Sequence, residues 1–413
     1  MIRRTVPQKT ISKESSLSGV GLHTGENVNL TFKPAPSNTG IVFIREDIEG
    51  DNSIEANIKF ISNTDRGTNL DNGSFRIHTS EHVLAALTGS DIDNCYISLD
   101  GPEVPIMDGS SKFFIEAIEE AKIVEQNALR EEFIPSEKIS FKCEETGSNL
   151  SLIPDDNYSI DTKIDFNTEV LGTQTASIND ITDFKEEISS SRTFSFLHEL
   201  ETLLEHGLIK GGDLNNAIVY VDKPLADSNM ERLKKAFNKT SISVTPNGIL
   251  DNLSLHHPNE AARHKLLDVI GDLALIGMKI RGKIIAEKPG HAVNAKFAQL
   301  VSESIKADRK NIIPIINFDK KPLMDSNQIM NVIPHRPPFL LIDEVLELSE
   351  SHVIGLRRVE QSESWVKGHF PGAPVMPGVL QVEFMAQAGG VLVLNTVPDP
   401  ENYLTFFMKM DKC

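Results

Sequence analysis

Segment 263–272, Arg-His-Lys-Leu-Leu-Asp-Val-Ile-Gly-Asp, constrains the possible structure of this chain more than any other part of it. His264, Asp268 and Asp272 recur at four-residue steps, so a helix would align them in one polar stripe beside an apolar face. An imidazole and a carboxylate one turn apart can reach a common divalent metal ion about 2 Å from each. Taken alone, the pattern is more typical of a hydrogen-bonded pair on a helix surface. Other parts of the sequence must decide between these interpretations.

A second segment, 77–82, places a glutamate directly beside a histidine. It precedes the apolar run 83–87, which predicts a helix that ends near Gly89. A catalytic zinc ion keeps three protein ligands and one water molecule, and that water needs a carboxylate base that is not itself a ligand. Glu81 beside His82 suits these two roles.

Two further histidines extend this polar set. His78 completes a His-x-x-Glu-His zinc-peptidase pattern with His82. We interpret His78 as a polar neighbour, with metal ligation as the alternative. His291 follows the apolar segment 284–286, so we expect it in a loop just past a strand. It could there donate a proton to a leaving group, with Asp272 holding it in its charged form.

Glu-His at 81–82, segment 263–272 and Gly-His-Ala at 290–292 together resemble the zinc-dependent UDP-3-O-acyl-N-acetylglucosamine deacetylases of lipid A biosynthesis. The resemblance covers about the first three quarters of the chain. The matching motifs also include Ser-Gly-Val-Gly-Leu-His-Thr-Gly at 18–25, Met-Asp-Gly-Ser at 107–110, Ser-Arg-Thr-Phe at 191–194 and Asn-Ala-Ile-Val at 216–219. The chain departs from the family at 144–149, which lacks a lysine that contacts substrate in many relatives. We therefore expect its nucleotide affinity to differ.

The resemblance implies a zinc site and two proton carriers. Zinc would be held by His82, His264 and Asp268. Glu81 would deprotonate the attacking water, and His291, backed by the second aspartate of the stripe, would protonate the departing amine.

The resemblance also implies residues that contact the substrate. Segment 189–194 alone predicts a polar lead into a helix, but Thr193 matches a family threonine that helps to stabilise the oxyanion. Lys265 lies next to a ligand and should point off the stripe, which suits a phosphate of a nucleotide-sugar substrate; the alternative is a solvated lysine. The residues that would line an acyl-chain passage are Phe194, Leu200, Ile209, Ala217 and Val219. For the aliphatic residues among them, ordinary packing in the core is an interpretation of similar weight.

A second constellation lies beyond the aperiodic stretch 307–323, which we interpret as a linker. Within it, the apolar run 379–394 is typical of a helix buried in a wrapped sheet. Burial would raise the pKa of Glu383 on this helix towards the range of an acid-base catalyst, with His369 as its partner. The alternative is structural, with Glu383 held by backbone donors and His369 bracing a loop.

This constellation resembles the (3R)-hydroxyacyl-carrier-protein dehydratases of the hotdog fold, through His-Phe-Pro-Gly-x-Pro-x-x-Pro-Gly-Val-Leu at 369–380 and Met-Ala-Gln at 385–387. The resemblance implies that His369 and Glu383 perform the elimination while backbone N–H groups near Gly378 face the thioester carbonyl. In that family the two residues meet across a dimer interface, so an acyl carrier protein and a second copy of the chain are implied partners. Because the chain stops soon after the strand-like 404–408, we expect an incomplete sheet and a fragment of a longer fused protein.

Length and periodicity predict an α+β protein with more than one core. We expect two similar deacetylase subdomains at 1–130 and 131–306, the linker, and a partial hotdog domain at 324–413. Strands are predicted at 28–32, 40–44, 139–141 and 158–161. A helix over 111–122 should bury Phe113, Phe114, Ala117, Ile118 and Ala121.

Composition limits the partners and the compartment. The formal net charge of −18 argues against nucleic acid as a partner. No segment has the length and apolarity of a transmembrane helix or a signal peptide. Three scattered cysteines fit a reducing environment. We therefore expect a cytoplasmic protein.

Three functions are compatible with these features. The first is zinc-dependent removal of acetate from the glucosamine nitrogen of a UDP-linked, 3-O-hydroxyacylated sugar, with a fused dehydratase segment. The second is a hydroxyacyl thioester lyase in which the hotdog unit is the working part. The third is a binder of acyl or nucleotide-sugar ligands without catalysis. We favour the first because all its proposed catalytic groups occur together.

Overall fold

The computed structural model describes residues 1–199, 210–211, 216–223, 231, 234, 241–250, 253–310, 321–349 and 352–405. The chain divides into two compact units, Met1–Ile312 and Ile313–Cys413. Each unit has its own hydrophobic core. Helices and strands are mixed in both, which confirms the α+β class.

The N-terminal half of the first unit is built on a five-stranded sheet of order β2-β3-β9-β4-β5. Only the β4–β9 pair in it is parallel. Alternate side chains of β3 are buried, as expected of a strand with one face on the core. The predicted strands 28–32 and 40–44 are confirmed, except that β4 begins after Gly40. The bounds are β2 Ser15–Val20, β3 Asn27–Pro34, β9 Cys95–Leu99, β4 Ile41–Arg45 and β5 Ser53–Glu55.

The C-terminal half of this unit repeats the same topology in a sheet of order β11-β12-β18-β13-β14. Again the last strand lies in the centre and pairs in parallel with the third. The repeated layout agrees with the two similar halves expected from the sequence, and the strands predicted at 139–141 and 158–161 are confirmed. The bounds are β11 Ile139–Cys143, β12 Ser148–Ile153, β18 Gly282–Glu287, β13 Tyr158–Asp165 and β14 Thr173–Ile178.

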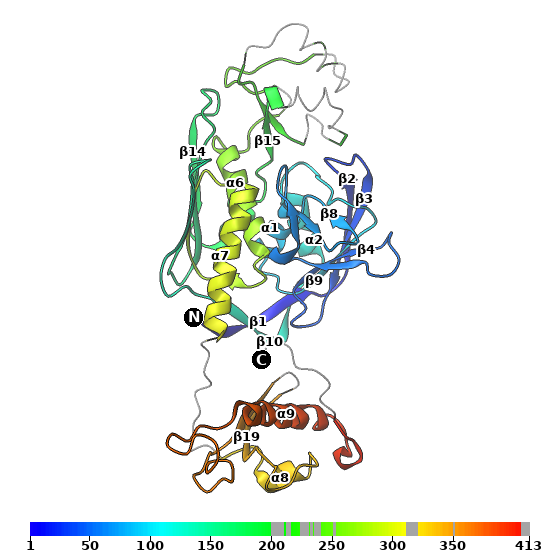
Figure 1. Ribbon diagram of the computed structural model, residues 1–413. Coiled ribbons are helices and arrows are strands. Elements are labelled where there is room, and N and C mark those ends of the chain that lie inside the picture. The colour runs from blue at the N-terminus through cyan, green and yellow to red at the C-terminus, as the bar shows by residue number, and fades with distance from the viewer. Residues whose placement is uncertain are drawn as a thin grey trace. The chain divides into compact units, whose positions relative to one another are not determined.

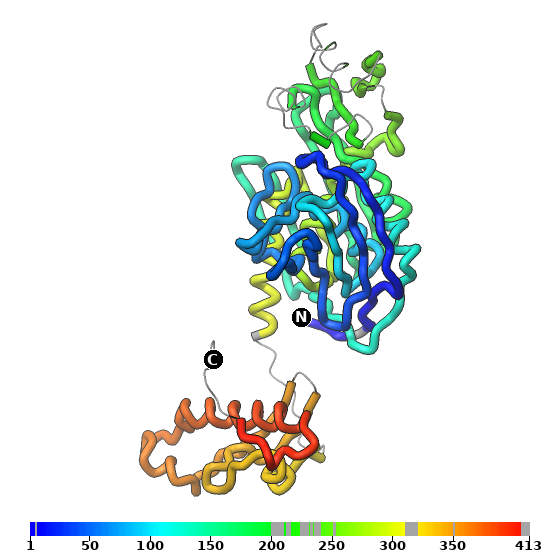
Figure 2. Tube along the Cα trace, turned by 90° about the vertical axis from the view of Figure 1, so that its right-hand side faces the viewer, coloured from blue at the N-terminus to red at the C-terminus, as the bar shows by residue number. Residues whose placement is uncertain are grey.

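Four helices lie between the two sheets (Figure 1). α6 and α7 pack on the C-terminal sheet, α2 packs on β2 of the N-terminal one, and α1 contacts both α2 and α6. Figure 2 shows the N-terminal half, in blue and cyan, towards the viewer. The pair α1 and α6 therefore lies at the centre of the unit. The bounds are α1 Glu81–Gly89, α2 Lys112–Glu120, α6 Glu260–Ala274 and α7 His291–Lys310.

One member of the predicted apolar face of α2 is misplaced. Phe114, Ala117, Ile118 and Ala121 are buried, whereas Phe113 is 37% exposed. Successive helical residues differ by about 100° around the axis, so Phe113 falls at the edge of the apolar stripe.

The smaller elements connect the halves. The sheet β1-β10-β17 joins strands from both ends of the unit. β10 runs across residue 130, and α7 covers 307–310 of the expected linker, so the domain boundaries stay predictions. The bounds are β1 Ile2–Ile11, β10 Ile123–Phe133, β17 Lys279–Ile280, β6 Ile61–Asn63, β7 Asn69–Asp71, β8 Arg76–Ile77, α3 Phe184–Glu187, β15 Phe194–Phe196 and β16 Ile218–Tyr220.

The contact between α1 and α6 depends on a glycine. A Cβ atom added to Gly271 would lie 2.1 Å from the carbonyl oxygen of Glu81. We expect Gly271→Ala to push the helices apart and to lower the free energy of unfolding of the first unit by about 1–3 kcal/mol or more. Calorimetry should show a lower thermal midpoint. Gly290→Ala is the control, because an added Cβ meets nothing within 4 Å there. Equal midpoints for the two variants would contradict the close helix contact.

The second unit contains α8 Ser326–Met330, β19 Glu344–Leu348, β20 Val353–Leu356 and α9 Gly378–Leu394. The helix predicted at 379–394 is confirmed. Its predicted burial is found on one side only: Ala388, Val391 and Leu394 are buried, whereas Val379 is 76% exposed, Met385 47% and Val393 55%. Within the part of this unit that the structure describes, β19 and β20 form its sheet, and two strands cannot surround a helix. The strand expected at 404–408 is absent at Leu404 and Thr405, and its remainder lies outside the described residues.

Across the described ranges, no helix combines the length and the apolarity needed to cross a membrane.

Candidate functional site

The two central helices bring three potential metal ligands together, His82 from α1 and His264 and Asp268 from α6. Their ligand atoms all lie within 4.8 Å of one another. Nε2 of His264 is 3.4 Å and Nε2 of His82 is 3.9 Å from Oδ1 of Asp268. A tetrahedral zinc ion about 2.0–2.1 Å from each ligand would separate its ligands by about 3.4 Å. The spacing of the three residues therefore fits such an ion.

The burial and the protonation of these three side chains also fit a metal ion. All three side chains are buried, and Oδ1 of Asp268 has no hydrogen-bond partner in the described part of the chain. Burial lowers the pKa of His82 to about 3 and also lowers that of His264, so both imidazoles are neutral and have a lone pair. Burial alone would raise the pKa of Asp268, but the charge of Lys265 and the nearby histidines lower it on balance. An unpartnered buried carboxylate oxygen facing two neutral imidazoles is costly unless a cation completes the group.

The orientation of His264 is held by the loop before β15. Its Nδ1 lies 3.0 Å from the carbonyl oxygen of Ser191, so its Nε2 faces the ligand group, the usual outer contact of a metal-binding histidine. This loop is tied to α6 by a buried ion pair. Arg192 donates from Nε to Oε1 of Glu260 over 2.8 Å and from Nη2 to Oε2 over 3.2 Å. The Ser-Arg-Thr-Phe motif thus positions a candidate ligand.

Glu81 lies beside the group without belonging to it. Its Oε2 accepts a hydrogen bond from the backbone N–H of Thr68 at 2.9 Å. Gly67, at φ +148°, permits this approach, because a Cβ there would lie 2.8 Å from Oε1 of Glu81. Burial, helped by Asp272 and Asp268, raises the pKa of Glu81 to about 7, against the opposing charge of His291. A carboxyl with this pKa can exchange a proton near neutral pH.

His291 faces the group from another direction. It is the first residue of α7, so the expectation of a loop position was wrong; the helix begins directly after Gly290. Its Nδ1 is 3.0 Å from Oδ2 of Asp272, and its Nε2 is 3.9 Å from Oδ2 of Asp268. Burial alone would lower its pKa, but these two carboxylates raise it to about 9. His291 is therefore protonated at neutral pH and can donate a proton.

Thr68 is a site residue that the sequence interpretation missed. Besides its N–H contact with Glu81, its hydroxyl donates to Oδ1 of Asp272 over 2.5 Å and lies 3.4 Å from Nδ1 of His291. Thr68 thus contacts both Glu81 and His291, the two groups that can exchange a proton. Its only sequence signal is the preceding glycine, which is common in turns.

The position of Lys265 corrects the sequence prediction. Its ammonium does not point off the stripe, but donates to Oδ2 of Asp268 over 2.7 Å and lies 5.7 Å from the ring centre of Phe194. A flexible four-carbon stem allows the group to turn back towards the carboxylate. Its proposed contact with a substrate phosphate stays a prediction.

Three motifs that are distant in the sequence meet near the site. The N–H of Thr193 donates to the carbonyl of Gly109 over 2.7 Å, and the N–H of Ile218 donates to the carbonyl of Thr193 over 2.9 Å. A Cβ on Gly109 would lie 2.1 Å from the carbonyl oxygen of Asn216, so this contact needs a glycine. The turn at 107–110 thereby supports the segment that carries Thr193.

The expected acyl passage is described in part. The ring of Phe194 packs edge-on against Phe166, Tyr220 and His264, with ring centres 5.5, 5.9 and 6.4 Å away. Val219 is buried and Ala217 half-buried. The other two expected members lie outside the described residues: Leu200 and Ile209.

His78 lies apart from the ligand group. Its Nδ1 is 3.1 Å from Oδ1 of Asn69. Nearby, the fully buried Glu103 accepts hydrogen bonds from the hydroxyls of Thr24 and Thr79 at 2.9 Å. Sequence reasoning missed Glu103, which joins the 18–25 motif to the segment leading into α1.

In the second unit, Glu383 contacts residues of its own chain other than His369. Its Oε1 lies 3.5 Å from Nε2 of His335 and accepts a hydrogen bond from Gln387 over 3.0 Å. Its side chain is 30% exposed, so the predicted burial is wrong within this chain. Nδ1 of His369 lies 2.7 Å from the carbonyl oxygen of Val375. The sequence interpretation missed His335 as a partner of Glu383.

Comparison with known proteins agrees with this arrangement. The sequence matches the family model of the UDP-3-O-acyl N-acetylglycosamine deacetylases (LpxC) over residues 8–239 and 228–303, and that of the FabA-like domain over 333–413. It is 44% identical over 404 residues to the bifunctional enzyme LpxC/FabZ of Bacteroides thetaiotaomicron, covering 98% of this chain and 87% of that protein.

Two further relatives show the same division. The bifunctional enzyme LpxC/FabZ of Porphyromonas gingivalis is 44% identical over 405 residues, 98% of this chain and 87% of that protein. The UDP-3-O-acyl-N-acetylglucosamine deacetylase of Myxococcus xanthus is 40% identical over 295 residues, 71% of this chain and 86% of that protein. The chain therefore belongs to the UDP-3-O-acyl N-acetylglycosamine deacetylase family and carries a FabA-like domain fused behind its deacetylase part.

Proposed function

We propose that the first unit is a zinc-dependent hydrolase that removes acetate from the nitrogen of UDP-3-O-(3-hydroxyacyl)-N-acetylglucosamine in lipid A biosynthesis. The observation that carries this proposal is the unpartnered buried oxygen of Asp268, which faces two neutral imidazoles beside a carboxyl with a pKa of about 7. The names of the relatives supply the substrate class.

His82, His264 and Asp268 would hold the metal. Bound there, zinc would polarise the amide carbonyl and lower the pKa of a water molecule. The other groups are protein side chains that move or hold protons.

Glu81 accepts a proton from the water that attacks the amide carbon, while the Thr193 hydroxyl donates a hydrogen bond to the developing oxyanion. His291 then gives its proton to the amine nitrogen as the C–N bond breaks, so that acetate and a free amine leave. Asp272 keeps His291 charged before this transfer, and Thr68 holds Asp272 in place.

The substrate would extend from this centre in two directions. Its acyl chain would lie along Phe194, Ala217 and Val219, whose surface is apolar. Lys265 would exchange part of its contact with Asp268 for a phosphate of the nucleotide.

Metal removal tests the proposal directly. The untreated chain should release acetate from this substrate, lose the activity after chelation, and regain it when zinc is added back. Mass spectrometry of the sugar product and metal analysis of each sample provide the measurements. Absence of acetate release by the zinc-loaded chain across several acyl lengths would reject the proposal and favour a ligand-binding role.

We propose a second activity for the FabA-like unit, removal of water from a (3R)-hydroxyacyl thioester on acyl carrier protein. The match over 333–413 favours it. Within this chain Glu383 contacts His335. In the dehydratases that this unit resembles, the histidine and the glutamate meet across a dimer interface, so His369 would come from a second copy. The proposal predicts enoyl-thioester absorbance that grows with dimer concentration. A monomer of full dehydratase activity would contradict the shared site.

A further inference from the structure

Thr79, which lies shortly before α1 begins, has a backbone conformation that its side chain disfavours. Its φ is +58°, in the left-handed region. A β-branched residue is rare there, because its side chain crowds its own backbone. Residues in such conformations persist only where their surroundings fix them. The contacts that fix Thr79 therefore decide how the chain enters α1.

The chain changes from extended to helical backbone at Thr79. On one side, His78 pairs with Glu103 in an isolated parallel bridge. On the other side, Ser80 already has helical backbone angles, with φ −79° and ψ −18°. The left-handed residue between them makes the turn, and α1 then begins with Glu81, the proposed base.

The start of α1 is not fixed by the usual side-chain cap. Ser80 occupies the N-cap position but makes no capping hydrogen bond. Its hydroxyl donates instead to the carbonyl oxygen of Thr68 over 2.8 Å, and its N–H donates to the same oxygen over 3.2 Å. The N–H of Thr68 in turn donates to Oε2 of Glu81 over 2.9 Å. The direction of the Glu81 side chain thus depends on where residues 79 and 80 place the chain.

The side chain of Thr79 is fixed by Glu103. Its hydroxyl donates to Oε1 of Glu103 over 2.9 Å, and the two residues are 3% and 0% exposed. Oε2 of Glu103 accepts from the N–H and the hydroxyl of Thr24 over 2.9 Å. The N–H of His23 lies 3.1 Å from both carboxylate oxygens. Glu103 is therefore an acceptor that the 18–25 motif holds in a fixed place.

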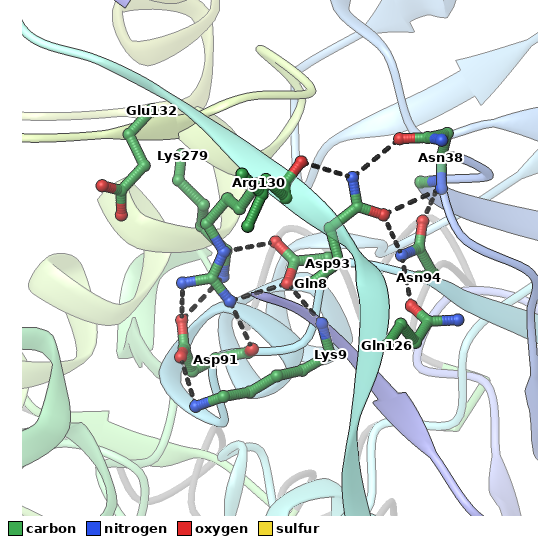
Figure 3. Close-up of polar contacts among 12 residues, drawn as sticks. Gln8, Lys9, Asn38, Asp91, Asp93, Asn94, Gln126, Arg130, Glu132 and Lys279 are labelled. Carbon is green, nitrogen blue, oxygen red and sulfur yellow. Dashed lines mark hydrogen bonds and ion pairs between the residues drawn. The ribbon is translucent and has the colours of Figure 1, made fainter. Parts of the chain in front are cut away.

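Glu103 is held without a cation, unlike the partly buried carboxylates that follow the other end of α1. There, Arg130 donates to both oxygens of Asp93 over 2.7 Å, and Lys9 donates to Oδ2 of Asp91 over 2.8 Å (Figure 3). Within the part of the chain that the structure describes, Glu103 forms no ion pair. A buried carboxylate without a cation depends on its hydrogen-bond donors, so the contact with the Thr79 hydroxyl stabilises both partners.

We propose that Glu103 is a positioning residue of the deacetylase site, which holds Thr79 in its left-handed conformation and thereby directs Glu81 towards the water that it deprotonates. The hydrogen bond to Oε1 offsets the cost of this conformation, and the conformation fixes Ser80 and the first turn of α1. Glu103 acts only through Thr79 and makes no hydrogen bond to a candidate metal ligand. The inference rests on the proposed deacetylase function, in which Glu81 is the base.

Three substitutions of Thr79 separate its hydroxyl from its backbone conformation. Thr79→Ser keeps the hydroxyl, so its kcat for acetate release should stay within about threefold of the parent. Thr79→Val keeps the shape and the strain but loses the donor, so kcat should fall at least about tenfold with KM close to the parent value. Thr79→Gly also loses the donor, but glycine adopts a φ of +58° freely and should lose less activity than valine. A packing role would give the reverse order, because glycine removes more atoms.

Amide hydrogen exchange measures the same effect without catalysis. In the metal-free chain, the peptide that covers the first turn of α1 should exchange faster in Thr79→Val than in Thr79→Gly or the parent. Thr88→Val is the matched control, because Thr88 lies at the other end of the same helix and has no positive φ. Its kcat and its exchange should equal those of the parent.

Glu103→Leu removes the acceptor itself. Because this change and Thr79→Val break the same hydrogen bond, their effects on kcat should not add in the double variant, and additive effects would contradict the proposal. If Glu103→Leu does not fold, the order within the Thr79 series decides. Parent-like kcat and exchange in Thr79→Val, or a larger loss in Thr79→Gly, would overturn the role of Glu103. A parent chain that releases no acetate would instead reject the proposed function, and the exchange order would still test the contact that fixes α1.

Discussion

Replacing Glu81 with glutamine is expected to lower kcat for acetate release by about 10²–10⁴-fold, the usual contribution of a positioned general base. Glutamine has nearly the same shape and can still accept the N–H of Thr68, which lies 2.9 Å from Oε2 of Glu81. It cannot take a proton from water. Because Glu81 is not among the three candidate ligands, metal content should be unchanged.

This variant separates a base from a ligand or a structural residue. The measurements are kcat and KM for the deacetylation, bound zinc per chain, and the thermal midpoint. Glu55→Gln, which removes an exposed carboxylate that pairs with Lys59, serves as the control. We expect a large loss of kcat with KM, zinc and midpoint close to those of the parent. Loss of zinc together with activity would show that Glu81 is a ligand instead.

Replacing His264 with alanine is expected to abolish zinc retention and acetate release together. The change removes one of three protein ligands and leaves Oδ1 of Asp268 facing a void. Loss of a contact one shell further out typically lowers metal affinity 10–100-fold, so loss of a direct ligand should lower it by more. The space left beside the buried Oδ1 of Asp268, whose other oxygen pairs with Lys265, should also lower the stability of the metal-free protein.

Zinc affinity by competition with a chelator measures this effect apart from catalysis. His257→Ala is the matched control, because His257 lies in the segment that leads into the same helix and outside the ligand group. Its zinc affinity should equal that of the parent. Zinc bound as tightly by His264→Ala as by the parent would remove His264 from the ligand set.

Features set by the local sequence could be predicted, whereas features that arise from contacts between distant segments could not. The stripe of α6, the end of α1 and the strands at 28–32 and 158–161 were predictable because local periodicity and turn residues determine them. The relation of His82 to His264 came from the family resemblance, since no local rule joins residues so far apart. Thr68 and Glu103 were missed because their roles arise from contacts that carry no periodic signal.

Side-chain direction was the least predictable feature. Lys265 was expected to point off the stripe, as its helical position indicates, but its long stem returns to Asp268. Glu383 was expected to be buried, because an apolar run predicts burial without stating what covers it, and the described part of the second unit leaves it 30% exposed. His291 was expected in a loop, because the glycine before it gave no sign that α7 begins there.

The sequence by itself determined the fold class and the fused organisation, because these follow from local periodicity and from motifs whose order is specific; its resemblance to a known family supplied the candidate ligand group. Only the tertiary structure decided the protonation of the site. Glu81, His82 and His291 have ordinary side chains, and their pKa values shift in different directions because packing removes water and places particular charges beside each of them. These neighbours come from segments that are far apart in the chain, so their effects exist only once the protein has folded.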